Sequence, residues 1–185
     1  MRLFVAINLP PELRQDIWNA AGPLREAAGS RVRWVPPDAL HLTLKFLGTV
    51  DQGRVPDLAG AVDAAARGAK PFSLPLDGFG AFPSPRRPQI VWLGCEAVPA
   101  LELLQHHVER SMQPLGFPVD GRPFRPHLTI GRVRRDERVP RGLATQIERL
   151  RYANETTVAQ VDLMESHLHQ SGARYVVRHR VPLTG

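Results

Sequence analysis

The segments His41-Leu42-Thr43-Leu44 and His127-Leu128-Thr129-Ile130 decide how the rest of this 185-residue chain is interpreted. Each consists of histidine, leucine, threonine and an aliphatic residue, and the two lie at corresponding positions of the two halves of the chain. A chain of this composition is expected to contain only about 0.05 His-x-Thr triplets with apolar x positions. Two occurrences are therefore poorly explained by chance, and they predict two similar halves.

Both segments have the period of a β-strand, in which side chains alternate between the two faces. His41, Thr43 and Lys45 are therefore expected on one face, and His127 and Thr129 on one face of the second strand. Each motif presents an imidazole and a hydroxyl about 6.5–7 Å apart, above an apolar face that can be buried. A lone strand histidine is usually a half-buried polar residue, and it is the repetition that favours a function.

Apolar periodicity and glycine or proline punctuation predict the elements around the motifs. Strands are expected at 3–7, 32–35, 41–47, 72–82, 89–95, 127–133, 158–168 and 175–181, and helices at 12–27, 55–66, 101–115 and 142–150. This order favours an α+β fold over a doubly wound one. We expect one domain over residues 1–185, made of two intertwined lobes, with the crossover between lobes in the Gly/Pro-rich stretch 78–88.

Composition indicates a folded, basic protein. Hydrophobic residues make up 43% and charged residues 23%, and the formal net charge is +6, which suits a nucleic-acid partner. An arginine-rich composition can equally reflect a GC-rich genome, so charge alone decides nothing. Seven arginines cluster around the second motif: Arg122, Arg125, Arg132, Arg134, Arg135, Arg138 and Arg141.

Other features of the sequence narrow the class of protein. The single cysteine, Cys95, excludes an intramolecular disulfide and a cysteine-rich metal site. No stretch approaches the roughly 20 apolar residues of a membrane span, and the first residues lack the long apolar region of a signal peptide. We therefore expect no membrane association and a cytoplasmic location.

Two histidines suit phosphodiester chemistry. Imidazole titrates near neutral pH, so one ring can accept a proton while the other donates one, without a metal. Threonine hydroxyls add hydrogen bonds to the nonbridging phosphate oxygens, where charge builds up in the transition state.

The two motifs, together with Arg2-Leu3-Phe4-Val5-Ala6-Ile7, Phe46-Leu47-Gly48 and Glu165-Ser166-His167-Leu168, resemble the 2′-5′ RNA ligase / RNA 2′,3′-cyclic phosphodiesterase family of two-histidine (2H) phosphoesterases. The resemblance spans almost the whole chain. It implies a bilobal, pseudo-symmetric α+β fold, in which two mainly antiparallel sheets flank a central cleft and the helices lie outside.

The resemblance also implies an activity. RNA ends that carry a 2′,3′-cyclic phosphate would be hydrolysed to 2′-phosphates, and some tRNA halves would be joined reversibly by a 2′-5′ linkage without ATP. The implied protein is a monomer that needs no cofactor and no metal.

Residue roles follow from the same resemblance. His41 would be the general acid toward the departing 3′ oxygen and His127 the base for water, while Thr43 and Thr129 hold the phosphate. Arg132 matches a phosphate-binding basic residue after the second motif. Strict alternation places Arg132 opposite His127, unless a bulge at Gly131 turns it back.

Three further residues are candidates for contacts with RNA. Phe4 and Phe46 would stack on a base, although apolar strand positions more often belong to the core. Lys45, expected beside Thr43, would contact the RNA backbone.

Two rival hypotheses remain. His106-His107-Val108-Glu109 and the pair His167 and His169 would, with a motif histidine, ligate a metal in a metal-dependent phosphoesterase. Alternatively, the basic balance and the aromatic residues would define a noncatalytic RNA-binding module.

Overall fold

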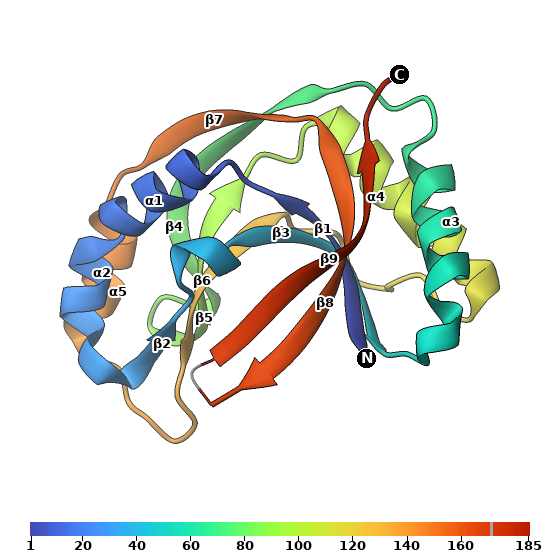
Figure 1. The fold of residues 1–185 in the computed structure, drawn as a ribbon. Helices are drawn as coiled ribbons and strands as arrows, with labels where there is room; N and C mark the ends of the chain where they lie inside the picture. The colour runs from blue at the N-terminus through green and yellow to red at the C-terminus, as the bar shows by residue number, and fades with distance from the viewer. Residues whose placement is uncertain (171) are drawn as a thin grey trace.

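A computed structural model describes residues 1–170 and 172–185, in which antiparallel strands form the framework and helices lie outside it (Figure 1). The strands are β1 (Arg2–Asn8), β2 (Val32–Trp34), β3 (His41–Thr49), β4 (Phe72–Ser84), β5 (Arg87–Cys95), β6 (His127–Val133), β7 (Ala153–Val158), β8 (Gln160–His169) and β9 (Gly172–Pro182). The α-helices are α1 (Pro11–Ala20), α2 (Gly22–Ala28), α3 (Val55–Ala66), α4 (Pro99–Met112) and α5 (Arg141–Arg149).

Within the described residues, the strands form one sheet of order β7-β4-β5-β6-β3-β1-β8-β9, with β2 paired to β6. One half of the sheet is β3-β1-β8-β9, and the other is β7-β4-β5-β6 with β2. The halves meet between β3 and β6 through a single registered pair, Leu42 with Leu128. The two sheets expected from the sequence are therefore joined at this seam into one curled sheet.

Helices cover both halves from outside (Figure 1). Helices α3 and α4 pack against each other beside β3, β8 and β9, while α2 packs against α5 beside the other half. The chain exchanges helices between halves, because α1 and α2 follow β1 and α4 follows β5. The predicted α+β fold with outer helices is confirmed.

The core fills the space between the sheet and the helices. Leu42, Leu93 and Leu128 are fully buried, as are Leu101 and Leu104 of α4. Burying one such side chain contributes about 1.5–3 kcal/mol. The apolar faces of the two motif strands are thus anchored, which fixes the direction of their polar faces.

Three expectations for the elements were wrong. The helix predicted at 12–27 is two helices, since Pro23 lacks a backbone N–H and lies in the first turn of α2, where no such donor is needed, instead of continuing α1. The strand predicted at 158–168 begins only at Gln160, and the preceding β7 was not predicted.

The stretch 78–88 is not a crossover between lobes. It lies within the β4–β5 hairpin, where Gly80 pairs with Trp92 and Ser84 with Arg87. The chain passes between the halves elsewhere: between β1 and β2, β2 and β3, β3 and β4, and β7 and β8. No helix in the described part of the chain is long and apolar enough to cross a membrane.

Candidate active site

The seam between β3 and β6 brings the two motifs together. In an antiparallel pair, the residues that flank Leu42 and Leu128 face each other across the strands, which places His41 beside Thr129 and Thr43 beside His127. Both leucines are fully buried, so these four side chains share the opposite face. The motifs are related by a local twofold axis through the leucine pair.

Each motif contains a β-bulge at its fourth residue. In β3, Thr43 pairs with Ala6 and Lys45 with Val5, so that Leu44 is the extra residue. In β6, Thr129 pairs with Trp92 and Gly131 with Val91, so that Ile130 is the extra residue. An extra residue reverses the alternation beyond it.

The bulges decide which later side chains join the histidines. Phe46 and Arg132, each five residues after its histidine, return to the histidine face, and both are exposed. Lys45 and Gly131 turn to the buried face. The predicted bulge that turns Arg132 back is present, although the extra residue is Ile130 and not Gly131.

Both imidazoles are held in the same way. His41 Nδ1 lies 2.9 Å from the carbonyl oxygen of Ala39, and His127 Nδ1 lies 2.7 Å from that of Arg125. A carbonyl only accepts, so Nδ1 carries the hydrogen. In the neutral ring, Nε2 is then the free acceptor, the state that a general base requires.

The environment lowers the pKa of both histidines. Burial is the main cause for His41; the hydrogen bond to Ala39 opposes it, and the positive charge of Arg132 lowers the pKa further. Burial also dominates for His127, where the hydrogen bond to Arg125 opposes it and the charges of Arg132 and Arg125 add to it. The charge of one guanidinium therefore acts on both rings.

Aromatic side chains orient the two rings. Tyr175 of β9 contacts His41 edge to face at 4.9 Å between ring centroids, and Phe82 of β4 contacts His127 in the same way at 5.0 Å. Burial raises the pKa of Tyr175, while the charges of Arg132 and Arg2 lower it. Sequence reasoning missed Tyr175 and Phe82, because strand periodicity does not show which distant strands flank a motif.

Phe4 and Phe46 have different surroundings. The ring of Phe4 lies 4.8 Å from that of His41, but Phe4 is only 3% exposed and packs with Ala6 and Met164. The prediction that Phe4 stacks on a base is therefore wrong, because its ring supports His41 from within. Phe46 is 66% exposed, so its ring is accessible on the histidine face.

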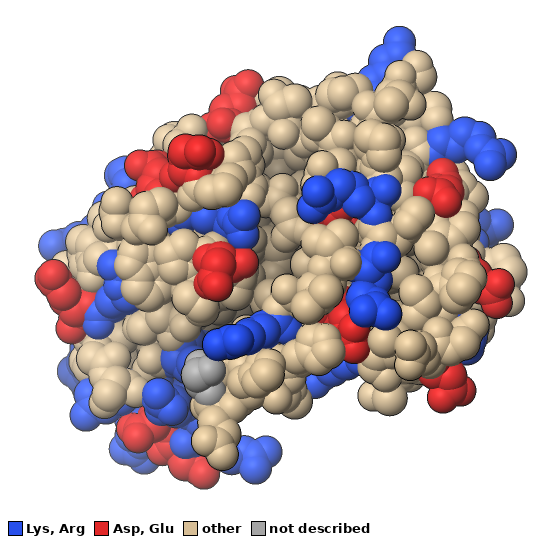
Figure 2. Space-filling model, in the orientation of Figure 1, with Lys and Arg blue, Asp and Glu red and all other residues tan. Residues whose placement is uncertain are grey.

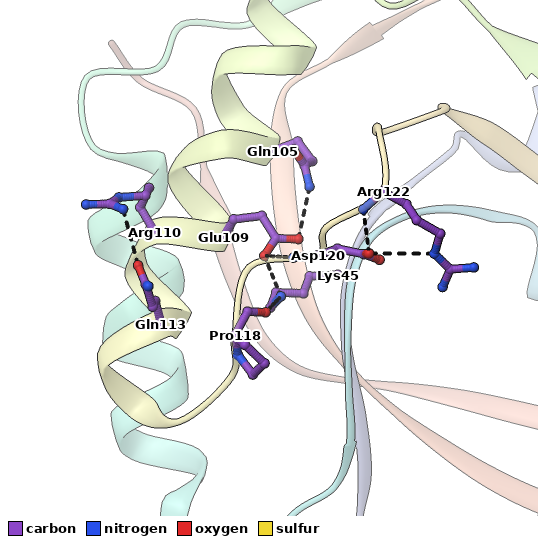
Figure 3. A network of polar contacts seen from close by, with 8 residues as sticks. All are labelled: Lys45, Gln105, Glu109, Arg110, Gln113, Pro118, Asp120 and Arg122. Carbon is purple, nitrogen blue, oxygen red and sulfur yellow. Dashed lines mark hydrogen bonds and ion pairs between the residues drawn. The ribbon is translucent and has the colours of Figure 1, made fainter.

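The prediction for Lys45 is also wrong. The bulge at Leu44 turns Lys45 away from the histidines, and the residue is 8% exposed. Its Nζ donates to Glu109 Oε2 of α4 at 2.5 Å and to the carbonyl oxygen of Pro118 at 2.9 Å (Figure 3). Lys45 is thus an internal ion-pair partner and not a contact for RNA.

This ion pair also helps to hold the segment that precedes the second motif. Glu109 Oε2 accepts from the backbone N–H of Asp120 at 3.4 Å, and Gln105 donates to Glu109 Oε1 at 3.2 Å (Figure 3). The network therefore joins β3, α4 and the segment that leads into His127. It couples the position of one motif to the other from behind the sheet.

The metal-site alternative finds no set of ligands. Across residues 1–170 and 172–185, no three His, Cys, Asp or Glu side chains gather in a way that would hold a metal ion. His106 and His107 lie on α4, with ring centroids 6.2 Å apart, and His167 contacts Glu165 on β8. In the described part of the chain, no hydrogen bond or ring contact links these histidines to His41 or His127.

The fold and the paired motifs define a two-histidine type of site, and comparison with known proteins identifies its family. Residues 13–170 match the model of the 2′-5′ RNA ligase superfamily, and the chain belongs to this family. The RNA 2′,3′-cyclic phosphodiesterase of Methanothermobacter thermautotrophicus is 33% identical over 177 residues, which covers 95% of each chain.

Solved structures agree with this membership. The protein TT0787 of Thermus thermophilus superposes with a TM-score of 0.83 at 30% identity, covering 100% of this chain and 99% of that one. LigT of E. coli, solved in complex with 3′-AMP, gives a TM-score of 0.76 at 29% identity, covering 100% and 98%. The bilobal 2H phosphoesterase fold expected from the sequence is thereby confirmed.

Proposed function

We propose that this protein is an RNA 2′,3′-cyclic phosphodiesterase that opens cyclic phosphate ends to 2′-phosphates, with His41 and His127 as its acid and base. The observation that carries the proposal is the seam, which sets two equivalent His-x-Thr motifs on one face with the charge of Arg132 acting on both imidazoles. Relatives that match the chain over most of its length carry the same activity in their names.

The chemistry follows from the state of each ring. His127 accepts a proton from water through Nε2 as the water oxygen attacks phosphorus. The bond from phosphorus to the 3′ oxygen breaks, and His41 donates a proton to that oxygen, which leaves a 2′-phosphate. His41 must therefore be protonated at the start. Burial and the charge of Arg132 lower its pKa in the free protein, and the bound anionic phosphate favours the protonated ring, which opposes this lowering.

Thr43, Thr129 and Arg132 complete the site as phosphate-binding groups. Two hydroxyls from opposite motifs and one guanidinium supply donors to the nonbridging oxygens, where negative charge builds up. A guanidinium also binds phosphate through two parallel hydrogen bonds, which orients the phosphorus between the rings. No step requires a metal or a cofactor.

The same arrangement supports 2′-5′ joining. If a 5′ hydroxyl of a second RNA takes the place of water, its attack releases the same 3′ oxygen and forms a 2′-5′ linkage without ATP. The substrates we propose are RNAs with cyclic ends, tRNA halves among them. We further propose that the protein acts in the cytoplasm as a monomer and a single domain of two intertwined lobes.

The decisive experiment is incubation with adenosine 2′,3′-cyclic phosphate and identification of the product by ³¹P NMR. We expect adenosine 2′-phosphate, formed at the same rate with and without EDTA. A 3′-phosphate product would overturn the assignment of the leaving oxygen. An inactive protein that still binds RNA would favour the noncatalytic module, and a loss of activity in EDTA that zinc restores would favour the metal-dependent alternative.

A further inference from the structure

A depression of about 810 Å³ lies between the β4–β5 turn and the connection from β6 to α5, and on the β6 side its lining begins at Val133, the residue after Arg132. Five arginines line it, and we call it the arginine groove: Arg86, Arg87, Arg134, Arg135 and Arg138. Blue side chains gather in the lower left of Figure 2, near the β6–α5 connection of Figure 1.

The arginine groove carries excess positive charge. Its two acidic lining residues are Asp136 and Glu137, and Glu137 lies 3.6 Å from Arg31, outside the groove. Within the described residues, none of the five arginines forms an ion pair with a carboxylate. Only Arg134 is held by the fold, through its Nε donating to the carbonyl oxygen of Ser30 at 2.8 Å.

The arginine groove begins where β6 ends, next in sequence to Arg132. Arg132 lies on β6, and Arg134 follows two positions later, about 6.5–7 Å along the chain. Ile90 of β5 pairs with Arg132, so the first residues of β5 run beside the end of β6 into the groove. Arg132 of the candidate site and Arg134 of the groove are thus two positions apart at the end of β6.

We infer that the arginine groove binds the sugar-phosphate backbone of the RNA strand on the 5′ side of the cyclic phosphate, an inference that rests on the proposed function. Guanidinium groups without carboxylate partners suit phosphates, which they bind through paired hydrogen bonds. The lining of the groove within the described residues contains no aromatic side chain on which a base could stack. Recognition there depends on the length of the RNA and not on its sequence.

The test removes charge from the groove without disturbing its walls. In R135A/R138A, two arginines without hydrogen bonds to the fold are truncated, while Arg134 is retained because it holds Ser30. The control is R67A/R110A, which removes the same charge from α4 and the end of α3. Both are compared with wild type on adenosine 2′,3′-cyclic phosphate and on a 12-nucleotide RNA with a cyclic end.

For R135A/R138A, we expect the ratio of kcat/KM for the RNA to kcat/KM for the cyclic nucleotide to fall at least tenfold. Binding of a fluorescein-labelled 12-nucleotide RNA ending in a 2′-phosphate should also depend less on salt. Each lost phosphate contact reduces the slope of log K against log salt concentration by about 0.7. The control variant should keep the wild-type ratio and slope.

The outcomes separate this inference from the proposed function. If the wild type does not open the cyclic nucleotide, the proposed function is wrong. RNA binding and its salt slope still test whether the groove binds the RNA backbone. An unchanged salt slope in R135A/R138A overturns the inference that the groove binds RNA. An equal reduction of the slope in the control R67A/R110A overturns it as well. The inference also fails if poly-glutamate competes for the groove more strongly than RNA does.

Discussion

The β3 segment 41–46 and the β6 segment 127–132 start alike and end differently. Both provide a histidine held by the carbonyl two residues earlier, a threonine and a bulge at the fourth residue. At the fifth and sixth residues, β3 has Lys45 and Phe46, whereas β6 has Gly131 and Arg132. Symmetry therefore supplies the two imidazoles that we propose as acid and base, and asymmetry supplies one cation and one exposed aromatic ring.

The buried position after each bulge shows why the halves diverge. A Cβ atom on Gly131 would lie 2.8 Å from atoms of Trp34 and Val32, so β2 leaves no room for a side chain there. On β3, the same position accommodates Lys45 and its ion pair with Glu109. A buried pair in one half thus corresponds to close backbone packing in the other.

Substitution of the two equivalent histidines should give the largest loss of activity. The variants H41A and H127A should each lose about 10²–10⁴-fold in kcat on a 2′,3′-cyclic nucleotide, because each removes one proton-transfer group. Circular dichroism should show an unchanged fold. The variant H106A, which removes an exposed histidine of α4, is the matched control and should retain activity. A loss below tenfold in either motif variant contradicts the shared role.

The variant R132A tests the position at which the two motif segments differ. We expect R132A to lose about 10²–10³-fold in kcat, the usual cost of removing a donor to a developing anion. Its positive charge disfavours protonation of both rings, so its removal should raise the pKa of His41 and of His127. Burial keeps both values below the ordinary one.

Histidine titration by NMR measures this shift, and R134A is the control, two residues further along the chain. If only one histidine responds in R132A, the charge of Arg132 does not act on both rings. If neither responds, the bulge does not turn its side chain to the histidine face.

Lys45 tests the buried difference between the halves. The variant K45A leaves the Glu109 carboxylate without its partner, and we expect a loss of about 3–5 kcal/mol in the free energy of unfolding. The double variant K45M/E109L should recover most of this loss, because a well-packed apolar pair replaces both charges. Urea denaturation checks both values. A stable K45A would show that Glu109 finds another partner.

These contrasts also show what the sequence could reveal. Strand alternation and the repeat were enough to place His41, Thr43, His127 and Thr129 on polar faces, since these residues precede both bulges. Gly68 marked the end of one helix, and α3 was predicted at its observed limits, 55–66. Information that is local along the chain was therefore readable.

What failed depends on contacts between distant segments. The bulge at Leu44 arises from pairing with β1, and it misplaced Lys45 by one face. Burial of Phe4 depends on Met164 and Tyr175, far away in the sequence. The crossover was placed at 78–88 because glycine and proline mark a turn without showing on which half of the sheet its strands lie.

Phe46 should give the smallest effect and the clearest view of the asymmetry. Because its ring is 66% exposed, F46A should change the free energy of unfolding by less than about 0.5 kcal/mol. If the ring stacks on the base next to the cyclic phosphate, KM for RNA should rise by about 5-fold or more, since one stacked base contributes about 1–3 kcal/mol. The variant F46W should retain the low KM, whereas an unchanged KM in F46A would leave Arg132 as the only functional difference between the two motifs.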